Sequence, residues 1–179
     1  MVNLAINGIG RIGKLVLKLL ISKNFNVKYL NELNGNTNSL IHSIEFDSIH
    51  GKWQANIEEG KDEIKIDGKS IKATFVENIN NLSLDDVDII IDCTGVHKSS
   101  SKLQKYFDKG VKKVIVSAPI NEDNIVNIAY GVNHNIYKPK EHNIITGASC
   151  TTNCIAPIIK VLHKNIGIKH GSITTIHNL

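Results

Sequence analysis

The first third of the chain alternates between short apolar runs and one amphipathic stretch. Residues 2–7, VNLAIN, are apolar and bounded by glycine, which predicts a strand. Residues 27–32, VKYLNE, predict a second strand. Between them, residues 11–23 carry apolar side chains at helical spacing, at Ile12, Leu15, Val16, Leu19 and Leu20. Together these segments predict a βαβ unit, whose crossover is nearly always right-handed.

The alternation of strands and helices continues along the chain, interrupted once by residues 55–75. We expect a short helix over residues 37–46 and antiparallel ribbons over residues 55–75, where the sequence alternates and turns at glycine. Residues 87–94, VDIIIDCT, are almost uniformly apolar, as in parallel strands buried on both faces. Further elements are a helix over 99–110 that stops at Gly110 and strands within 112–118, 124–131 and 142–149. The alternation predicts a Rossmann-like, doubly wound α/β sheet with appended antiparallel ribbons.

The character of the sequence changes near residue 150. A segment of small residues, GASCTTNC, leads into a helix with apolar periodicity, and residues 171–176 predict a strand. We therefore expect one domain over residues 1–149 and the beginning of a second over residues 150–179.

Composition and charge exclude several classes of protein. The 179 residues are 41% hydrophobic and 21% charged, as in ordinary globular proteins, and no apolar run reaches the roughly 18 residues that span a membrane. Three cysteines and no recognisable secretory signal predict a reducing, cytoplasmic setting without a disulfide framework. The net charge of +4 comes with scattered lysines, so a nucleic-acid partner is not expected.

The glycine spacing after the first strand suggests a phosphate site. Gly8, Gly10 and Gly13 form G-x-G-x-x-G between a predicted strand and helix, the context of a dinucleotide site. Glu32 ends the second strand, where a carboxylate accepts from ribose hydroxyls and repels a 2′-phosphate, so NAD is favoured over NADP. The alternative is a plain glycine turn with a surface glutamate.

A second candidate site surrounds Cys150. Ser149 is a plausible N-cap, which would place Cys150 in the first turn of a helix, where the macrodipole stabilises a thiolate. We expect Cys154, one turn on, to be buried and unreactive, and His177 to be the partner base. Cys150 could instead be a small buried residue. A metal site is disfavoured, because Cys-x3-Cys is not a usual zinc spacing and no second pair is present.

Taken together, these stretches resemble phosphorylating glyceraldehyde-3-phosphate dehydrogenase. The matching motifs occur in the family's order over essentially the whole chain and are INGIGRIGK, FDSIHGKW, DGKSIK, IDCTGV, VIVSAP, YGVN, HNIITGASCTTNC and TTIH. ASCTTNC is the most specific of them. The resemblance implies that residues 1–149 form an NAD-binding domain and that residues 150–179 are the first helix and strand of an incomplete α+β catalytic domain.

The resemblance also implies roles for individual residues. Cys150 would be the nucleophile and His177 its base, with Ser149 and Thr151 binding inorganic phosphate. The cofactor-binding residues would be Gly8, Gly10, Arg11, Ile12, Gly13, Glu32, Asn78, Thr94, Gly95 and Ser117. The implied reaction is glycolytic: NAD-dependent oxidative phosphorylation of D-glyceraldehyde 3-phosphate to 1,3-bisphosphoglycerate through a cysteine thioester, in a cytoplasmic homotetramer without a membrane partner. The alternatives are erythrose-4-phosphate dehydrogenase and a non-catalytic NAD-binding module.

The sequence departs from the family in two important ways. Glu32 stands where the family usually has aspartate, which weakens the preference for NAD over NADP. The family's chains are about twice as long, so we expect the 179 residues alone to be inactive and poorly soluble. The apolar face of the helix after Cys150 would be exposed in such a fragment.

Overall fold

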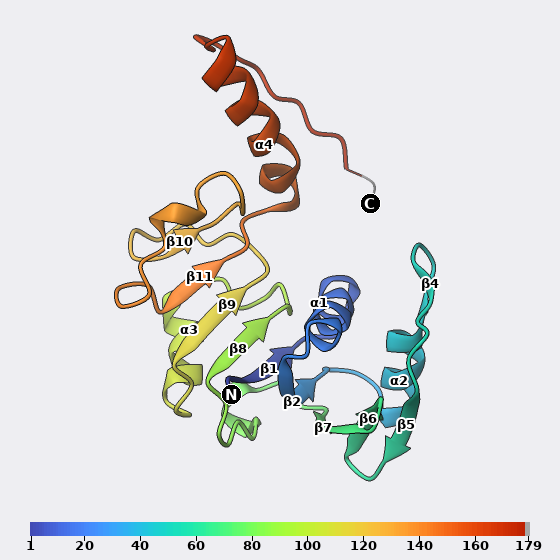
Figure 1. Cartoon of the computed structure of the whole chain (residues 1–179). Helices are drawn as coiled ribbons and strands as arrows, with labels where there is room; N and C mark the ends of the chain where they lie inside the picture. The colour runs from blue at the N-terminus through green and yellow to red at the C-terminus, as the bar shows by residue number, and fades with distance from the viewer. Residues whose placement is uncertain (178–179) are drawn as a thin grey trace.

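A nine-stranded sheet forms the centre of the computed structural model, which describes residues 1–177 (Figure 1). From one edge to the other its strands are β10 (Val126–Asn127), β11 (Ile144–Thr146), β9 (Lys113–Val116), β8 (Ile89–Asp92), β1 (Asn3–Asn7), β2 (Asn26–Asn31), β7 (Lys69–Thr74), β6 (Glu63–Ile66) and β5 (Ile57–Gly60). Neighbours from β10 to β7 are parallel, whereas β7, β6 and β5 pair antiparallel. The predicted doubly wound sheet with an appended antiparallel ribbon is confirmed.

Helices cover both faces of this sheet, because neighbouring residues of its central strands point to opposite faces. Ile6 of β1 packs in one core with Leu17 of α1 (Arg11–Ser22) and with α2 (Thr37–Glu45). Ala5 packs in a second core with Leu103 of α3 (Ser100–Phe107). The short helices η1 (Ile79–Asn81) and η2 (His134–Ile136) lie in connections.

A small two-stranded sheet stands beside α2. It pairs β3 (Phe46–Asp47) with β4 (Gly51–Lys52). Lys14 of α1 holds Asp47 at 2.6 Å between Nζ and Oδ2. The Lys14 ammonium and the amides of His50 and Ile49 keep the pKa of Asp47 far below its usual range, so this carboxylate stays charged at acidic pH as well.

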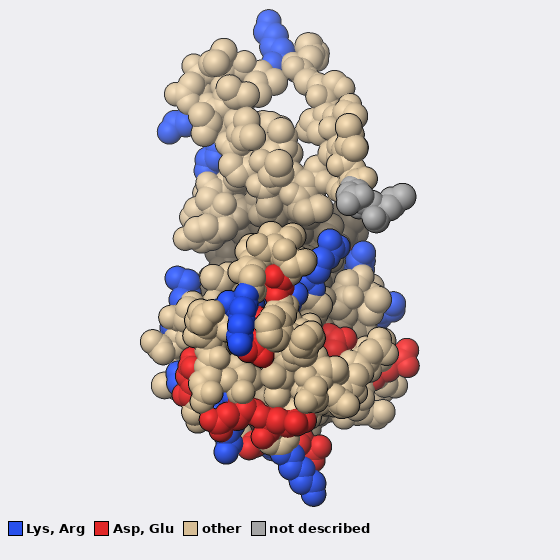
Figure 2. All heavy atoms as spheres, turned by 90° about the vertical axis from the view of Figure 1, so that its right-hand side faces the viewer, with Lys and Arg blue, Asp and Glu red and all other residues tan. Residues whose placement is uncertain are grey.

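The last helix, α4 (Cys150–Asn165), projects from the body and buries none of its residues (Figure 1). Its apolar side chains are largely exposed, as expected, with Ile158 at 53% and Val161 at 61% of their full accessible surface. Figure 2 shows that this projecting part carries few charged side chains on the visible face, whereas the body below it carries both signs. None of the described helices combines the length and apolarity needed to cross a membrane.

One expectation for the end of the chain is wrong. Residues 171–177 follow an irregular path instead of forming a strand over 171–176. Within residues 1–177 no strand lies beside this segment, and an isolated strand has no partner for its backbone groups. The strand expected within residues 124–131 is present as the two residues of β10. The domain boundary at residue 150 stays a prediction.

Candidate cofactor cleft and nucleophile

The turn between β1 and α1 requires glycine at two positions. Gly8 has φ +88°, and a Cβ there would lie 2.8 Å from the carbonyl carbon of Cys93. A Cβ on Gly13 would lie 1.9 Å from the Gly8 oxygen, so α1 could not approach β1 as closely. A Cβ on Gly10 would meet no atom within 4 Å, which leaves the start of α1 open. Close packing at two glycines and open space at the third are what a pyrophosphate at a helix N-terminus needs.

Glu32 borders this turn at the end of β2. Its Oε2 accepts a hydrogen bond from the Ile9 amide at 2.7 Å, and its Oε1 accepts one from the Leu33 amide at 2.8 Å. These bonds fix the carboxylate beside the glycine turn. Each carboxylate oxygen has a second lone pair, so Glu32 can still accept from ligand hydroxyls.

A cleft of about 660 Å³ opens at the carboxyl ends of β1, β2 and β8. This is where ligands bind in open α/β sheets. Five of the expected cofactor residues line it, namely Gly8, Gly10, Glu32, Asn78 and Thr94. The Asn78 side chain also caps η1 by accepting from the Asn80 amide at 3.0 Å.

The remaining expected cofactor residues lie around this cleft. Arg11, Ile12 and Gly13 form the first turn of α1, which has no side-chain cap. Gly95 follows Thr94 with φ +74°, and the Ser117 amide donates to the Asp92 carbonyl at 2.9 Å after β9.

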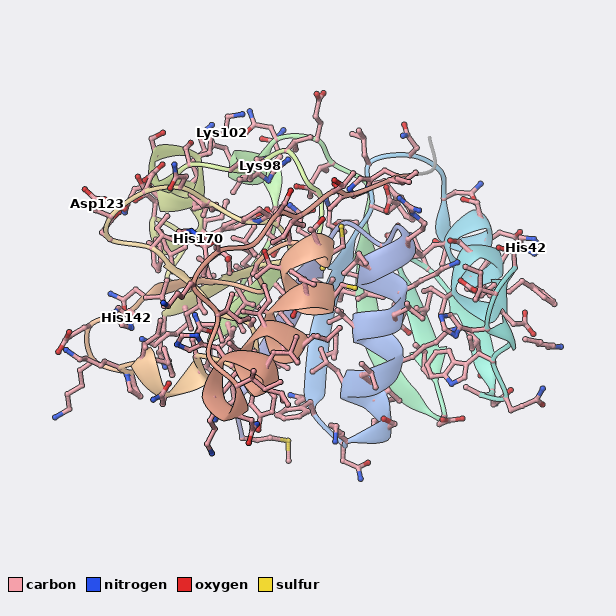
Figure 3. The ribbon with its side chains drawn as sticks, turned by 90° about the horizontal axis from the view of Figure 1, so that it is seen from above. His42, Lys98, Lys102, Asp123, His142 and His170 are labelled. Atoms are coloured by element: carbon pink, nitrogen blue, oxygen red, sulfur yellow. The ribbon has the colours of Figure 1, made fainter. Side chains whose placement is uncertain are left out.

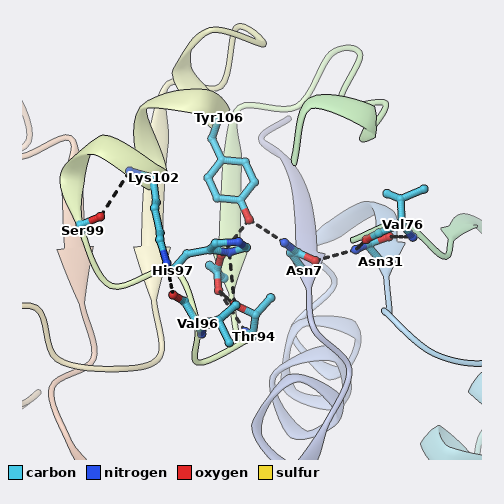
Figure 4. Close-up of polar contacts among 10 residues, drawn as sticks. Asn7, Asn31, Val76, Thr94, Val96, His97, Ser99, Lys102 and Tyr106 are labelled. Carbon is cyan, nitrogen blue, oxygen red and sulfur yellow. Dashed lines mark hydrogen bonds and ion pairs between the residues drawn. The ribbon is translucent and has the colours of Figure 1, made fainter. Parts of the chain in front are cut away.

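A buried polar network, which the sequence analysis does not predict, lies beneath the cleft (Figure 4). Asn31 Nδ2 donates to Asn7 Oδ1 at 2.7 Å, and Asn7 Nδ2 donates to the Tyr106 hydroxyl at 2.6 Å. Tyr106 in turn donates to Asp92 Oδ2 at 2.7 Å. Burial and the nearby Asp92 carboxylate raise the pKa of Tyr106 far above its usual range, so its hydroxyl stays a donor. The network therefore joins three strands and α3 at the floor of the cleft.

Asp92 also forms hydrogen bonds with two residues that line the cleft, Thr94 and His97. It is fully buried, and its Oδ1 accepts from the Thr94 amide at 3.0 Å and the Thr94 hydroxyl at 2.7 Å. Its Oδ2 lies 2.7 Å from His97 Nδ1, which donates because a carboxylate only accepts. His97 lines the cleft with its ring held in this orientation. One feature of the sequence could have indicated this network. Two apolar strands each end in a polar residue, Asn7 in LAIN and Asp92 in IIID.

Replacing Asp92 by alanine is expected to lower the free energy of unfolding by about 2–3 kcal/mol, because four buried or half-buried donors lose their acceptor. Urea unfolding at pH 7 measures the change. Asp85 is a matched control, since it is exposed and accepts only from Ser83 at 2.8 Å. Asp85→Ala is expected to change stability by less than about 0.5 kcal/mol. Equal effects of the two variants would contradict a structural role for the network.

The expected nucleophile, Cys150, lies at the start of α4. Ser149 is the N-cap, as expected, and its Oγ accepts from the Thr152 amide at 3.0 Å. Cys150 is the first helical residue and is exposed, and Thr151 follows it in the same turn. Cys154 is also exposed, so its expected burial is wrong; the physical reason is that α4 contacts the body through Lys160, which donates to the Gly131 and Val132 carbonyls, and buries none of its residues.

His177 is exposed in the irregular segment, and within residues 1–177 no hydrogen bond joins it to Cys150. The segment after α4 turns back and runs toward the body (Figure 1). The structure thus brings Ser149, Cys150 and Thr151 together but does not bring His177 to them.

The other thiol and the histidines do not assemble into a second centre. Burial raises the pKa of Cys93 to about 11, which keeps this thiol protonated beneath the cleft. His42 lies on the opposite side of the molecule from His142 and His170 (Figure 3). In the part of the chain that the structure describes, no three potential metal ligands cluster.

Comparisons with known proteins agree with this geometry. The family model described as "Glyceraldehyde 3-phosphate dehydrogenase, NAD binding domain" matches residues 2–100, and the C-terminal domain model of the same family matches residues 149–179. Glyceraldehyde-3-phosphate dehydrogenase 3 of a Nostoc species is 39% identical over 99% of this chain and 53% of its own length. The enzymes of Thermotoga maritima and Geobacillus stearothermophilus are 39% and 38% identical over 99% of this chain.

The chain spans about half the length of the curated relatives it matches. The matched NAD-binding domain covers the glycine turn, Glu32 and the strands that border the cleft, so the cofactor of this cleft is NAD. From the cleft geometry, the two family models and these identities it follows that the chain belongs to the glyceraldehyde-3-phosphate dehydrogenase family.

Proposed function

We propose that this chain supplies the cofactor site and the nucleophile of an NAD-dependent dehydrogenase that oxidises and phosphorylates D-glyceraldehyde 3-phosphate. One observation carries the proposal: Cys150 opens a Ser149-capped helix directly after β11, a parallel strand of the sheet that holds the cleft. Because parallel strands share one carboxyl edge, the thiol and the cofactor cleft emerge from the same side of the sheet.

The residues around the cleft fit NAD. The amides of Arg11 and Ile12 at the uncapped start of α1 would bind the pyrophosphate, where Gly10 leaves open space. Glu32 would accept from the adenosine ribose. Asn78, Thr94, Gly95 and Ser117 would border the rest of the cofactor at the strand ends. Bound NAD supplies the acceptor for the hydride that leaves the substrate.

The protein's own residues would carry the covalent chemistry. The Cys150 thiolate attacks the aldehyde carbon, and a C–S bond forms as the carbonyl oxygen takes the negative charge, next to the amides of the helix start. His177, which has taken the thiol proton of Cys150, would give that proton to the oxyanion to form the hemithioacetal hydroxyl, and would take it back when hydride leaves that carbon. A thioester to Cys150 remains.

Inorganic phosphate completes the reaction. Ser149 and Thr151 would bind it beside the thioester, and one phosphate oxygen attacks the acyl carbon. The C–S bond breaks, the Cys150 thiolate is released, and 1,3-bisphosphoglycerate leaves. For His177 to act on Cys150, the rest of a complete catalytic domain would have to hold the segment after α4 with the imidazole within hydrogen-bond reach of the thiol.

The homotetramer, the cytoplasmic location and the preference for glyceraldehyde 3-phosphate over erythrose 4-phosphate belong to this proposal. A second candidate, a non-catalytic NAD-binding module, is favoured by the fact that within residues 1–177 no hydrogen bond joins His177 to Cys150, and both are exposed. The two functions share the cleft and differ at Cys150, because a binding module needs no reactive thiol.

Glu32 provides the test of the cofactor site. Glu32→Gln is expected to weaken NAD binding about tenfold, because a charged acceptor for ribose hydroxyls becomes neutral. The preference for NAD over NADP should fall, since the repulsion of a 2′-phosphate is also lost. Isothermal titration with both dinucleotides measures the change. Glu58→Gln, at an exposed carboxylate of β5, serves as the control and should leave both affinities unchanged. Equal binding of NAD and NADP by the unaltered chain would contradict the role of Glu32.

A further inference from the structure

A hydrogen-bonded pair of polar side chains, the buried Thr146 and the half-buried Asn127, contacts the chain just before the nucleophile. Thr146, the last residue of β11, is 1% exposed. Its Oγ1 donates to Asn127 Oδ1 at 2.6 Å and accepts from the Ala148 amide at 3.1 Å. We call Asn127 and Thr146 the clip. The clip links the end of β10 to the backbone two residues before Cys150.

Asn127 is itself held from several sides. Its Nδ2 donates to the Ile120 carbonyl at 2.7 Å, and its Oδ1 accepts from the Ile120 amide at 3.1 Å. Its backbone carbonyl accepts from Asn133 Nδ2 at 3.0 Å. The acceptor that Thr146 meets is therefore fixed in position, and buried polar networks that are fully bonded in this way are rigid.

The clip holds Ala148, whose backbone conformation is unfavourable. Ala148 has φ +57° and is 5% exposed, although left-handed geometry is costly for a residue with a Cβ. Such a conformation persists only where its surroundings impose it. The Ala148 amide is held by Thr146, and the preceding Gly147 amide donates to the Val116 carbonyl at 2.8 Å.

The left-handed turn determines where α4 begins. After Ala148 the chain becomes extended at Ser149, with φ −98° and ψ 163°, and Cys150 is the first helical residue. Asn153 Nδ2 donates to the Gly147 carbonyl at 2.7 Å and the Ser149 carbonyl at 2.9 Å, which ties the turn to the helix. A relaxed, right-handed Ala148 would redirect the chain and displace the cap and the thiol together.

We propose that Asn127 and Thr146 are positioning residues for Cys150: they impose the left-handed turn at Ala148 and so place the thiol at the amides that open α4. The inference rests on the proposed function, in which Cys150 is the nucleophile. It adds two residues that touch neither substrate nor cofactor.

Competition between two thiols of the same helix tests the inference. Cys150 and Cys154 are both exposed, so the ratio of their alkylation rates by iodoacetamide is an internal measure in one molecule. Peptide mass spectrometry of the folded 179-residue chain gives this ratio. In Thr146→Val, which keeps the side-chain shape and removes the hydroxyl, the ratio of Cys150 to Cys154 is expected to fall about three- to tenfold. Thr146→Ser should retain it.

Thr74→Val is the matched control, because Thr74 also ends a strand and donates to an asparagine, Asn31, at 2.9 Å. It should leave the ratio unchanged, whatever its effect on stability. Asn127→Ala should lower the ratio in the same direction as Thr146→Val, and it replaces that variant if Thr146→Val does not fold.

Glycine at position 148 separates positioning from general destabilisation. Because glycine adopts φ +57° without strain, the double variant Thr146→Val/Ala148→Gly is expected to recover most of the ratio. A ratio unchanged in both Thr146→Val and Asn127→Ala overturns the inference alone, as does a loss that Ala148→Gly does not recover. If Cys150 reacts no faster than Cys154 in the unaltered chain, the start of α4 does not activate the thiol and the positioning inference fails alone; failure of the proposed function is measured separately, by turnover of Cys150→Ser.

Discussion

Replacing Gly13 by alanine is expected to lower the free energy of unfolding by about 4 kcal/mol or more, which is enough to unfold many domains of this size. The added Cβ would lie 1.9 Å from the Gly8 oxygen and 2.9 Å from the Gly8 carbonyl carbon. Both atoms belong to the backbone, so no side-chain rotation relieves the overlap. Helix α1 would have to move away from β1, which would expose Leu17, now fully buried.

Gly10→Ala provides the comparison within the same motif. A Cβ at Gly10 meets nothing within 4 Å, so this variant should change stability by no more than about 1 kcal/mol. It should nevertheless weaken NAD binding, because the methyl group would project where we propose that the pyrophosphate lies. Thermal unfolding by circular dichroism and NAD titration separate the two effects. If Gly13→Ala melts at the same temperature as Gly10→Ala, the close packing of α1 on β1 is wrong.

Cys150→Ser is expected to reduce the rate of NADH formation from glyceraldehyde 3-phosphate, NAD and phosphate by at least about 10³-fold in the natural protein at its full length. A serine hydroxyl is a far weaker nucleophile than a thiolate at neutral pH, and an ester would replace the thioester that phosphate must attack. NAD affinity should be unchanged, because Cys150 does not line the cleft. Absorbance at 340 nm follows the reaction.

Cys154→Ser is the control for this experiment. Cys154 is one turn further along α4 and exposed, and serine there should leave the rate within about twofold. Equal losses in the two variants would indicate damage to α4 rather than loss of a nucleophile. Unimpaired turnover by Cys150→Ser would indicate a different nucleophile, and an absence of turnover in the unaltered protein would favour the non-catalytic module.

The features predicted correctly from the sequence depend on short stretches of chain. The glycine turn, α1 and β2 follow from spacing and periodicity within residues 2–32, and Ser149 caps a helix whose first turn it adjoins. Glu32 directly follows β2, as expected, because the distance along the chain from the glycine turn to the end of the second strand is nearly constant in βαβ units; its contact with the ribose stays a prediction.

The missed residues have partners that are distant along the chain. Asn7 bonds to Tyr106 across 99 positions, and Asn127 bonds to Thr146 across 19. Nothing in the local pattern distinguishes an asparagine that ends a strand in solvent from one that joins a buried network. The left-handed conformation of Ala148 was equally invisible, because alanine rarely adopts it and only the surrounding bonds impose it.

The two errors at Cys154 and at residues 171–176 have one cause. Apolar periodicity predicts which face of a helix is to be covered, and alternation predicts a strand, but neither states what covers the face or pairs with the strand. In residues 1–177 nothing buries the residues of α4 and no strand pairs with 171–177, so the thiol is exposed and the strand does not form.

The sequence by itself thus determined the parallel sheet, the glycine turn for NAD and the helix start that carries Cys150, because hydrophobic period, glycine geometry and capping act between near neighbours. Only the tertiary structure decided which buried polar groups meet beneath the cleft, how the Ala148 turn is held, and which faces of α4 stay exposed, because these depend on contacts between strands and helices that the folded sheet brings together.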